Sequence, residues 1–136
     1  MPIQLRYDKN SDILYASLTG IVTMADFKNS ILELSENTEF PPNVDSLVDV
    51  SQMEFNDVDT SFLKEVIAME KQNPGRQGAR VAYVADSNLN YGMLRMYEGL
   101  ADNIAKTSKV FRTVSEGEAW IMESKSNKNP PQSNNT

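Results

Sequence analysis

Hydrophobic and polar residues alternate at the start of the chain, which is the pattern of a strand with one buried face. Over residues 3–8, Ile3, Leu5 and Tyr7 occupy one face and polar side chains occupy the other. Residues 13–20 form a second apolar-rich run after a short polar turn. The pattern therefore predicts an N-terminal antiparallel hairpin. Its register is left open, because the connection is longer than the tightest hairpin turns.

Beyond this hairpin, the spacing of apolar residues switches between the helical and the extended period. Residues 80–86, RVAYVAD, are apolar through their middle, which is typical of a strand inside a largely parallel sheet. The alternation of strands and helices predicts an α/β fold with a mostly parallel, five-stranded mixed sheet and about four helices. The expected elements after the hairpin are a helix after Thr23, a strand at residues 47–50, a helix opened by Asp59, Thr60 and Ser61, a strand at residues 80–86, a helix after Asn88, a strand at residues 109–114 and a short helix capped by Ser115 and Glu118.

The chain of 136 residues is expected to hold one domain. Its apolar periodicity ends near residue 123. Residues 124–136 are polar, with a Pro-Pro pair and no large apolar side chain. A segment of this composition buries too little apolar surface to offset the entropy lost on ordering. We therefore expect a single domain over residues 1–123 and a disordered polar tail over residues 124–136, whose deletion leaves stability unchanged.

The composition argues against several classes of function. With 13 Lys and Arg against 19 Asp and Glu, the net charge is −6, which disfavours nucleic acid as a partner. The sequence has no histidine and no cysteine, so it lacks the most common general base, the usual zinc ligands and any disulfide. We accordingly expect no enzymatic activity, no cofactor and no bound metal.

The stretch from Leu47 to Met69, LVDVSQMEFNDVDTSFLKEVIAM, has the pattern of a strand, an acidic turn and a helix. It resembles the sulfate-transporter and anti-sigma-factor-antagonist (STAS) domain, in which a strand and turn precede Asp-Ser-Ser-Gly-Leu at the start of a helix. Here Asp-Thr-Ser-Phe-Leu, residues 59–63, occupies that place. The run YGMLRMYEGL at residues 91–100 is similar to the SpoIIAA-like branch of the group. The resemblance covers roughly residues 3–122 and implies a STAS/SpoIIAA-like fold.

The resemblance also implies a role for the start of the second helix. The family's phosphorylated serine corresponds to Ser61, and free backbone N–H groups at a helix N-terminus stabilise a phosphate. Asp57 and Asp59 oppose a phosphate by like-charge repulsion, and Phe62 replaces the family's glycine. The alternative interpretation is that these polar residues only cap the helix. The candidate partner surface consists of Asp57, Asp59, Thr60 and Phe62.

A second candidate surface lies on the predicted third helix. Its residues are Tyr91, Met93, Arg95 and Tyr97. Adaptable methionine and amphipathic tyrosine rings are common at interfaces. The same residues at helical spacing also pack in cores, so core packing and a partner or ligand surface both stay open. We expect this helix to bury Met96 and Leu100 and to leave Arg95 accessible.

Two functions from different classes follow. The first is a non-enzymatic regulatory or interaction domain, resembling anti-sigma-factor antagonists, that binds another protein, a regulator or a kinase-like partner, in a bacterial complex. The second is a carrier of a small apolar or lipid-like ligand between the third helix and the sheet. The sequence leaves a homodimer open. No apolar run approaches the ~18 residues of a membrane span and no signal-peptide pattern is present, so we expect a cytoplasmic protein.

Overall fold

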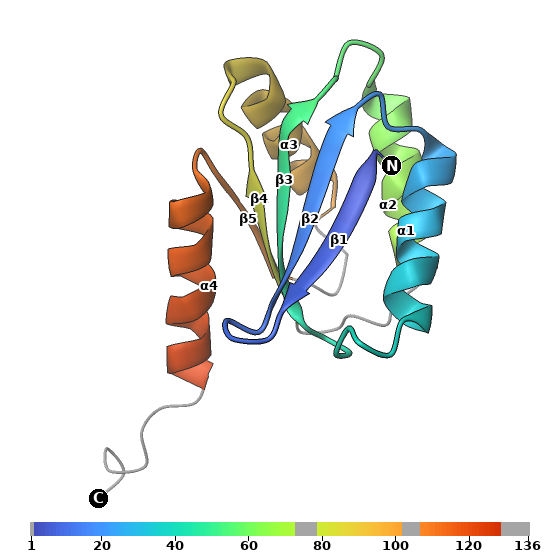
Figure 1. Ribbon diagram of the computed structural model, residues 1–136. Helices are drawn as coiled ribbons and strands as arrows, with labels where there is room; N and C mark the ends of the chain where they lie inside the picture. Colours follow the sequence, from blue (N-terminus) through green and yellow to red (C-terminus); the bar gives the residue numbers. More distant parts are fainter. Residues whose placement is uncertain (1, 73–78, 102–106, 129–136) are drawn as a thin grey trace, which may run out of the picture.

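The protein is described by a computed structural model, which covers residues 2–72, 79–101 and 107–128 (Figure 1). Residues 129–136, which make up most of the expected polar tail, lie outside the described residues. The elements in chain order are β1 (Ile3–Asp8), β2 (Ile13–Gly20), α1 (Met24–Glu36), β3 (Asp45–Met53), α2 (Thr60–Lys71), β4 (Arg80–Val84), α3 (Asn88–Leu100), β5 (Thr107–Phe111) and α4 (Val114–Lys128).

The five strands in the described part of the chain form one mixed sheet in the order β1-β2-β3-β4-β5. β1 and β2 pair antiparallel, with Ile3 opposite Leu18 and Asp8 opposite Ile13. The pairs β2–β3, β3–β4 and β4–β5 are parallel. Together with the helices, this confirms the predicted α/β architecture and its N-terminal hairpin. β4 has a neighbour on each side and is largely buried, as its apolar run predicts.

The order of the strands decides which face of the sheet each helix covers. A crossover between neighbouring parallel strands is almost always right-handed. From β2 to β5 the chain advances one strand at a time in one direction, so α1, α2 and α3 are placed on the same face. α4 follows the last strand and lies on the other side of the sheet from α1 and α2 (Figure 1). One face is therefore covered by three helices and the other by α4.

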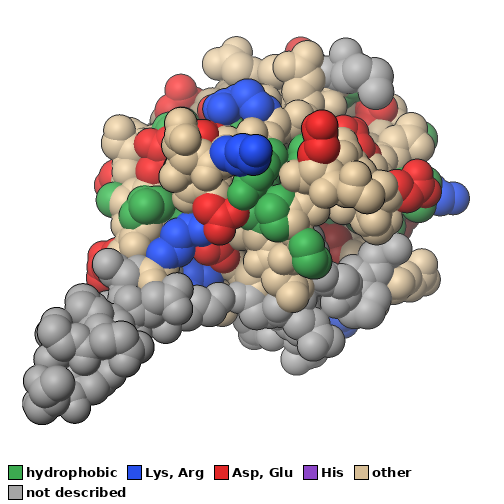
Figure 2. All heavy atoms as spheres, turned by 60° about the horizontal axis from the view of Figure 1, so that its bottom comes forward, with side chains coloured by type: hydrophobic (Ala, Val, Ile, Leu, Met, Phe, Trp, Pro, Cys, Tyr) green, Lys and Arg blue, Asp and Glu red, His purple; other side chains and the backbone are tan. Residues whose placement is uncertain are grey.

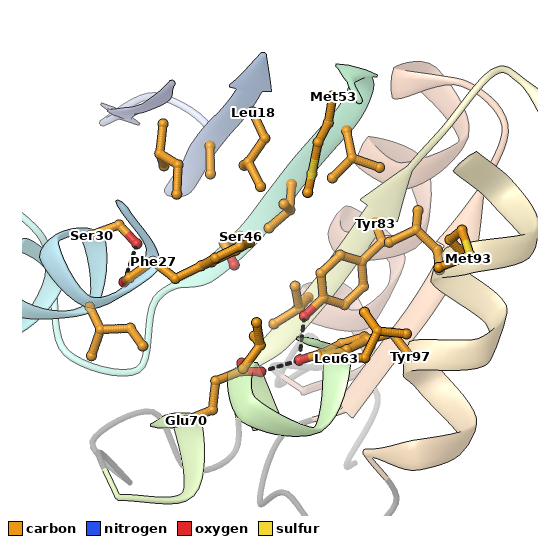
Figure 3. A pocket seen from close by; sticks show the side chains of 18 of the residues that line it. Leu18, Phe27, Ser30, Ser46, Met53, Leu63, Glu70, Tyr83, Met93 and Tyr97 are labelled. Carbon is orange, nitrogen blue, oxygen red and sulfur yellow. Dashed lines mark hydrogen bonds between the residues drawn. The ribbon is translucent and has the colours of Figure 1, made fainter. Parts of the chain in front are cut away.

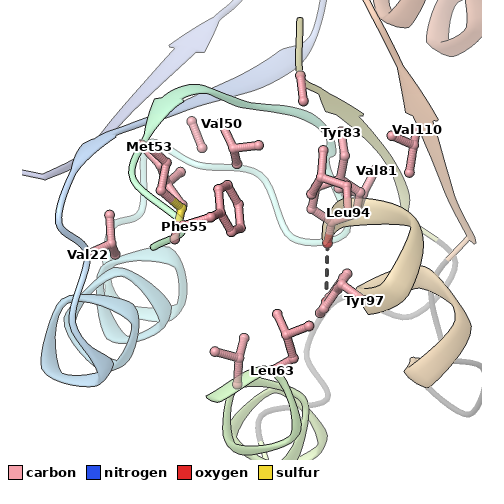
Figure 4. Close-up of a cluster of buried hydrophobic side chains, with 14 of the residues drawn as sticks. Val22, Val50, Met53, Phe55, Leu63, Val81, Tyr83, Leu94, Tyr97 and Val110 are labelled. Carbon is pink, nitrogen blue, oxygen red and sulfur yellow. Dashed lines mark hydrogen bonds between the residues drawn. The ribbon is translucent and has the colours of Figure 1, made fainter. Parts of the chain in front are cut away.

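Each face has its own hydrophobic core. The larger core lies under α2 and α3 and includes Leu63 and Leu94 (Figure 4). The smaller core lies beneath α4, where Ile121 packs against side chains of β2, β3 and β4. α4 approaches the sheet closely at Gly117, because a Cβ atom there would lie only 3.2 Å from the Cβ of Ala82. Glycine thus lets this helix pack directly on β4.

Short polar residues begin the first three helices, and the sequence predicted the caps of the first two. The Thr23 hydroxyl accepts a hydrogen bond from the backbone N–H of Asp26 at 3.2 Å, and the Asp26 carboxylate accepts one from the Thr23 N–H at 2.8 Å. Asp59 caps α2 by accepting a hydrogen bond from the N–H of Phe62 at 2.9 Å. Ser87 caps α3 in the same way. These bonds satisfy backbone donors that have no partner within the helix.

The start of α4 differs from the prediction. Its cap is Thr113, whose hydroxyl accepts from the N–H of Glu116 at 3.2 Å and donates to the Glu116 carboxylate at 3.1 Å. The predicted pair, Ser115 and Glu118, has the same spacing two positions later. β5 consequently ends at Phe111, earlier than expected. The sequence contains two overlapping capping boxes, Thr113 with Glu116 and Ser115 with Glu118, and the helix begins at the first of them.

α4 is also longer than the sequence predicts. It continues to Lys128, so the domain boundary expected after residue 123 falls inside the helix. Lys125 gives the reason, because its Nζ lies 3.5 Å from a carboxylate oxygen of the buried Asp45 and 3.1 Å from one of Asp12. Local composition does not reveal this extension, because the contacts join residues far apart in the sequence.

α3 turns a different face to the core than expected. Met96 and Leu100, which were expected to be buried, are 44% and 37% exposed, whereas Leu94 and Tyr97 lie in the core. Asn90 shares the buried face, and its side-chain amide donates to two backbone carbonyls of β3 at 2.8 and 3.1 Å. The expectation for Met96 and Leu100 is therefore wrong, because a polar residue with buried partners interrupts the apolar stripe.

Candidate ligand-binding site

A cavity of about 160 Å³ lies between the larger core face of the sheet and the helices that cover it (Figure 3). Side chains of β1, β2, β3 and β4 line it from the sheet, and side chains of α1, α2 and α3 line it from the other side. Most of these side chains are apolar. The volume is close to the ~150 Å³ at which an engineered apolar cavity in another protein binds benzene.

Small residues and the placement of α1 explain why this space is open. Ala16 in β2 and Ser46 in β3 line the cavity from the sheet, where larger side chains would fill it. From α1, Phe27 and Ile31 line the opposite wall. None of the 13 residues of α1, all of which are described, is fully buried. A helix that rests on the ends of its side chains, rather than interlocking with the sheet, leaves volume beneath it.

One end of the cavity is polar. Tyr97 donates a hydrogen bond to a carboxylate oxygen of Glu70, and Tyr83 donates to the Tyr97 oxygen at 3.3 Å (Figure 3). The two tyrosine rings meet edge to face, with their centroids 5.4 Å apart. Burial, followed by the nearby Tyr83 and Glu70, raises the pKa of Tyr97 well above its ordinary value of 10.0. The Tyr97 phenol therefore stays protonated at neutral pH.

The candidate residues at the start of α2 divide into two groups. Those exposed to solvent are Asp57, Asp59, Thr60 and Ser61. Phe62 is half-buried and lines the cavity, and its ring meets that of Phe27 edge-on with the centroids 5.9 Å apart. Phe62 thus packs against α1, and the polar residues beside it form the outer surface.

The candidate residues on α3 are likewise split between the cavity and the surface. Met93 and Tyr97 line the cavity. Arg95 is exposed, as expected, and forms an ion pair at 3.4 Å with the carboxylate three residues later. Tyr91 is half-buried beneath the guanidinium of Arg112, whose Cζ lies 4.0 Å from the ring centroid. The two alternatives that the sequence left open, core and surface, therefore each describe part of this set.

The sequence-based site lacks three residues that define the cavity, Ala16, Glu70 and Tyr83. Tyr83 carried a usable signal, since a tyrosine in an otherwise aliphatic buried strand requires a partner for its hydroxyl. Glu70 carried no such signal, because a glutamate in the last turn of a helix resembles any surface residue. Ala16 also carried no signal, because the effect of a small side chain on a cavity depends on the residues that surround it.

The described surface is mixed in character on the face that Figure 2 shows. Lys and Arg side chains lie among Asp and Glu there rather than gathering in one patch. Within the described residues, no helix combines the length and the apolar character that crossing a bilayer requires.

Comparison with solved structures identifies a similar fold. The chain is similar to an uncharacterized protein of the DUF3478 family from Shewanella loihica PV-4, described as having a SpoIIAA-like fold. The TM-score is 0.59 and the sequence identity 15%, over 88% of this chain and 91% of that chain. No family model and no curated protein matches the sequence. The resemblance seen in residues 59–63 and 91–100 is therefore confirmed at the level of the fold, which is SpoIIAA-like.

Proposed function

We propose that this SpoIIAA-like protein is a non-enzymatic binding domain for a small apolar molecule, held between the sheet and α1, α2 and α3. The observation that carries the proposal is the cavity of about 160 Å³ with its largely apolar lining. Of the two functions expected from the sequence, it supports the carrier of a small apolar ligand. The cavity involves α1 and α2 as well as the third helix, where the sequence had placed the ligand.

The energetics of an apolar cavity support binding. An unfilled cavity costs roughly 24 cal/mol per Å³ because its lining lacks packing partners. For about 160 Å³ this corresponds to on the order of 4 kcal/mol. A ligand that fills the space recovers part of this cost and removes its own apolar surface from water. Since neither gain depends on direction, the size and shape of the ligand are selected first, and a molecule the size of benzene fits.

The test fills the cavity from the sheet and measures the binding of benzene. Ala16→Leu places a larger side chain in the space that Ala16 borders. We expect its dissociation constant for benzene to rise at least tenfold, since the ligand then competes with a covalently attached group. The measurement is a titration followed by the amide signals of β2, β3 and α2 in two-dimensional NMR spectra.

The matched control makes the same chemical change on the outer surface. Ala68 is exposed on α2, so Ala68→Leu should bind benzene as the wild type does. Equal benzene affinity in Ala16→Leu and wild type would contradict the proposal. So would benzene-induced shifts confined to amides outside the cavity lining.

We propose a protein-docking function for the start of α2 as the second candidate. The observation that favours it is the exposure of Ser61 in the first turn of α2, beside the exposed Asp57, Asp59 and Thr60. A phosphate on Ser61 would interact favourably with the helix N-terminus and unfavourably with the two carboxylates. We propose that phosphorylation of Ser61 releases a protein partner from this surface at the start of α2.

Substitutions at Ser61 test the second candidate. Ser61→Ala and Ser61→Asp should both fold with stability close to wild type, because the dipole contributes only about 0.3–1 kcal/mol at an exposed helix end. In a pull-down from cells of the source organism, Ser61→Asp should lose a partner that wild type and Ser61→Ala retain. If both variants retain every partner, Ser61 acts only in starting the helix.

A further inference from the structure

We propose that the cavity selects aromatic ligands, whose apolar part is a benzene-like ring, over aliphatic molecules of the same size. The inference rests on the proposed function, because it names the chemical class of the molecule bound in the same cavity. The observation behind it is the composition of the lining, in which aromatic rings and methionine thioethers come from the sheet and from all three helices that cover it.

Aromatic side chains are concentrated in the lining of the cavity. The chain has five phenylalanines and five tyrosines, all of them within the described residues. Half of these ten border the cavity, and they are Phe27, Phe55, Phe62, Tyr83 and Tyr97. Because they belong to α1, the segment after β3, α2, β4 and α3 respectively, a molecule in the cavity meets rings from the sheet and from the helices.

The lining rings contact one another in the geometry that aromatic groups prefer. Phe27 and Phe62 meet edge to face, with their centroids 5.9 Å apart and their planes at 66°. The rings of Tyr83 and Tyr97 do the same at 5.4 Å and 71°. This arrangement places the positive edge of one ring against the negative face of another. An aromatic ligand has the same distribution of charge and can extend this packing, whereas a saturated ring has no such face.

Two methionines add a second kind of group that favours an aromatic ring. Met53, at the end of β3, and Met93, on α3, line the cavity from different sides (Figure 3). A thioether sulfur makes favourable contacts with an aromatic ring, often at the ring edge. The unbranched methionine side chain can also adjust its position to the ring that it meets. The lining thus offers an aromatic ligand contacts that it does not offer an aliphatic one.

Two probes of similar volume separate ring chemistry from the burial of apolar surface. Benzene is aromatic, and cyclopentane is a saturated ring of nearly the same size. Cyclopentane leaves water at least as readily as benzene, so burial alone predicts that it binds at least as tightly. We expect benzene instead to bind the wild-type protein about tenfold more tightly than cyclopentane, which is the effect of one or two favourable aromatic contacts. Dissociation constants are measured by NMR titration of the cavity amides.

Substitution of Phe62 tests the source of the preference. Phe62→Leu removes the ring and keeps an apolar side chain, so the advantage of benzene over cyclopentane should fall to about threefold or less. Both probes are measured on the same variant, so a change of cavity volume that affects them alike cancels in the ratio. The matched control is Phe111→Leu, the same change in the smaller core beneath α4, which should keep the wild-type ratio. If Phe62→Leu does not fold, Phe27→Leu removes the other ring of the pair.

The outcomes distinguish failure of the inference from failure of the proposed function. If cyclopentane binds as tightly as benzene or more tightly, the cavity is an apolar binding site without the proposed selectivity, and the inference alone fails. If benzene keeps its full advantage in Phe62→Leu and in Phe27→Leu, the rings of the lining are not its source, and the inference again fails. If neither probe shifts the cavity amides, both the inference and the proposed function are overturned.

Discussion

At the scale of single residues, Tyr97 links the core to the polar end of the cavity. Its pKa is raised above 10.0 in the folded protein, chiefly by burial. Above about pH 10, the unfolded chain loses a proton that the folded chain retains, so unfolding becomes more favourable. The contribution of Tyr97 to stability is thus complete below pH 10 and declines as the pH rises further. We predict that Tyr97→Phe flattens the fall in unfolding free energy between about pH 9 and pH 11.

The measurement is urea unfolding at several pH values, compared with Tyr91→Phe, the same change at a half-buried position of the same helix, as the matched control. Tyr7 and Tyr15 also have raised pKa values, from a hydrogen bond to Asp12 and from burial respectively. Both remain in every variant, so the difference between slopes isolates Tyr97. At pH 7, Tyr97→Phe should cost about 1.5–3 kcal/mol, because it removes a hydrogen bond to a carboxylate. Identical pH slopes in wild type and Tyr97→Phe would contradict the assignment.

Single residues are also where sequence-based prediction reached its limit. Helix caps such as Thr23 and Asp59 could be predicted, because their partners lie within three residues. Asn90 could not, because its amide bonds to carbonyls of β3 about 40 residues away in the chain. The Tyr97–Glu70 bond is of the same kind, since it joins two helices. A side chain whose role is set by a distant partner carries no local signal.

At the scale of the elements, α4 is held by its contact with the sheet at Gly117. A Cβ atom there would lie 3.2 Å from the Cβ of Ala82 and from a methyl group of Leu47. A Cβ atom added to Gly99 of α3 would instead point into open space, with no neighbouring atom within 4 Å. Alanine favours a helix over glycine by about 0.5–1 kcal/mol, so Gly99→Ala should stabilise the protein by roughly that amount.

We predict the opposite sign for Gly117→Ala. The added methyl group displaces α4 from β4, and overpacking of this kind typically costs about 1–3 kcal/mol, which exceeds the gain in helix propensity. Both variants are compared with wild type by urea unfolding. Equal stabilisation by the two substitutions would show that α4 can shift away from the sheet without a loss of stability. The contact between Gly117 and the sheet would then not be close-packed.

At the scale of the whole molecule, the end of α4 joins two distant segments. The side chain of Lys125 is 23% exposed, and its ammonium group contacts Asp12 and Asp45, of which the Asp45 side chain is 8% exposed. We predict that a chain ending at residue 128 is as stable as the full chain, because the removed residues, NPPQSNNT, include no large apolar side chain. A chain ending at residue 123 should lose about 1–3 kcal/mol, since it leaves a buried carboxylate without its cation.

The substitution Lys125→Met tests this cause without shortening the chain. It should reproduce most of the loss, whereas Lys64→Met, on the exposed side of α2, should leave the unfolding free energy within about 0.5 kcal/mol of wild type. Thermal and urea unfolding provide the measurement. If the chain ending at residue 123 is as stable as wild type, the contact with Asp45 contributes nothing.

The overall architecture was the most predictable level, because it depends on repeated patterns rather than on single contacts. Residues 3–8 and 80–86 show their strands by alternation and by continuous apolar character, and the order of elements then fixes an α/β fold. The cavity could not be predicted in the same way. It is a volume that no side chain fills between Ala16, Ser46 and α1. Such a volume depends on the three-dimensional positions of all the residues that line it, which local sequence patterns do not give.

The order of the strands in the sheet has a consequence for how the chain is made. Because the sheet order is the chain order, each new strand pairs with the one synthesised just before it. A ribosome that releases residues 1–20 has already delivered the complete first hairpin, and every later strand emerges to meet a free edge. The sheet can thus assemble strand by strand while the chain is being translated. Within the described residues, α4 follows all five strands, so the face of the sheet that it covers stays open until α4 is made.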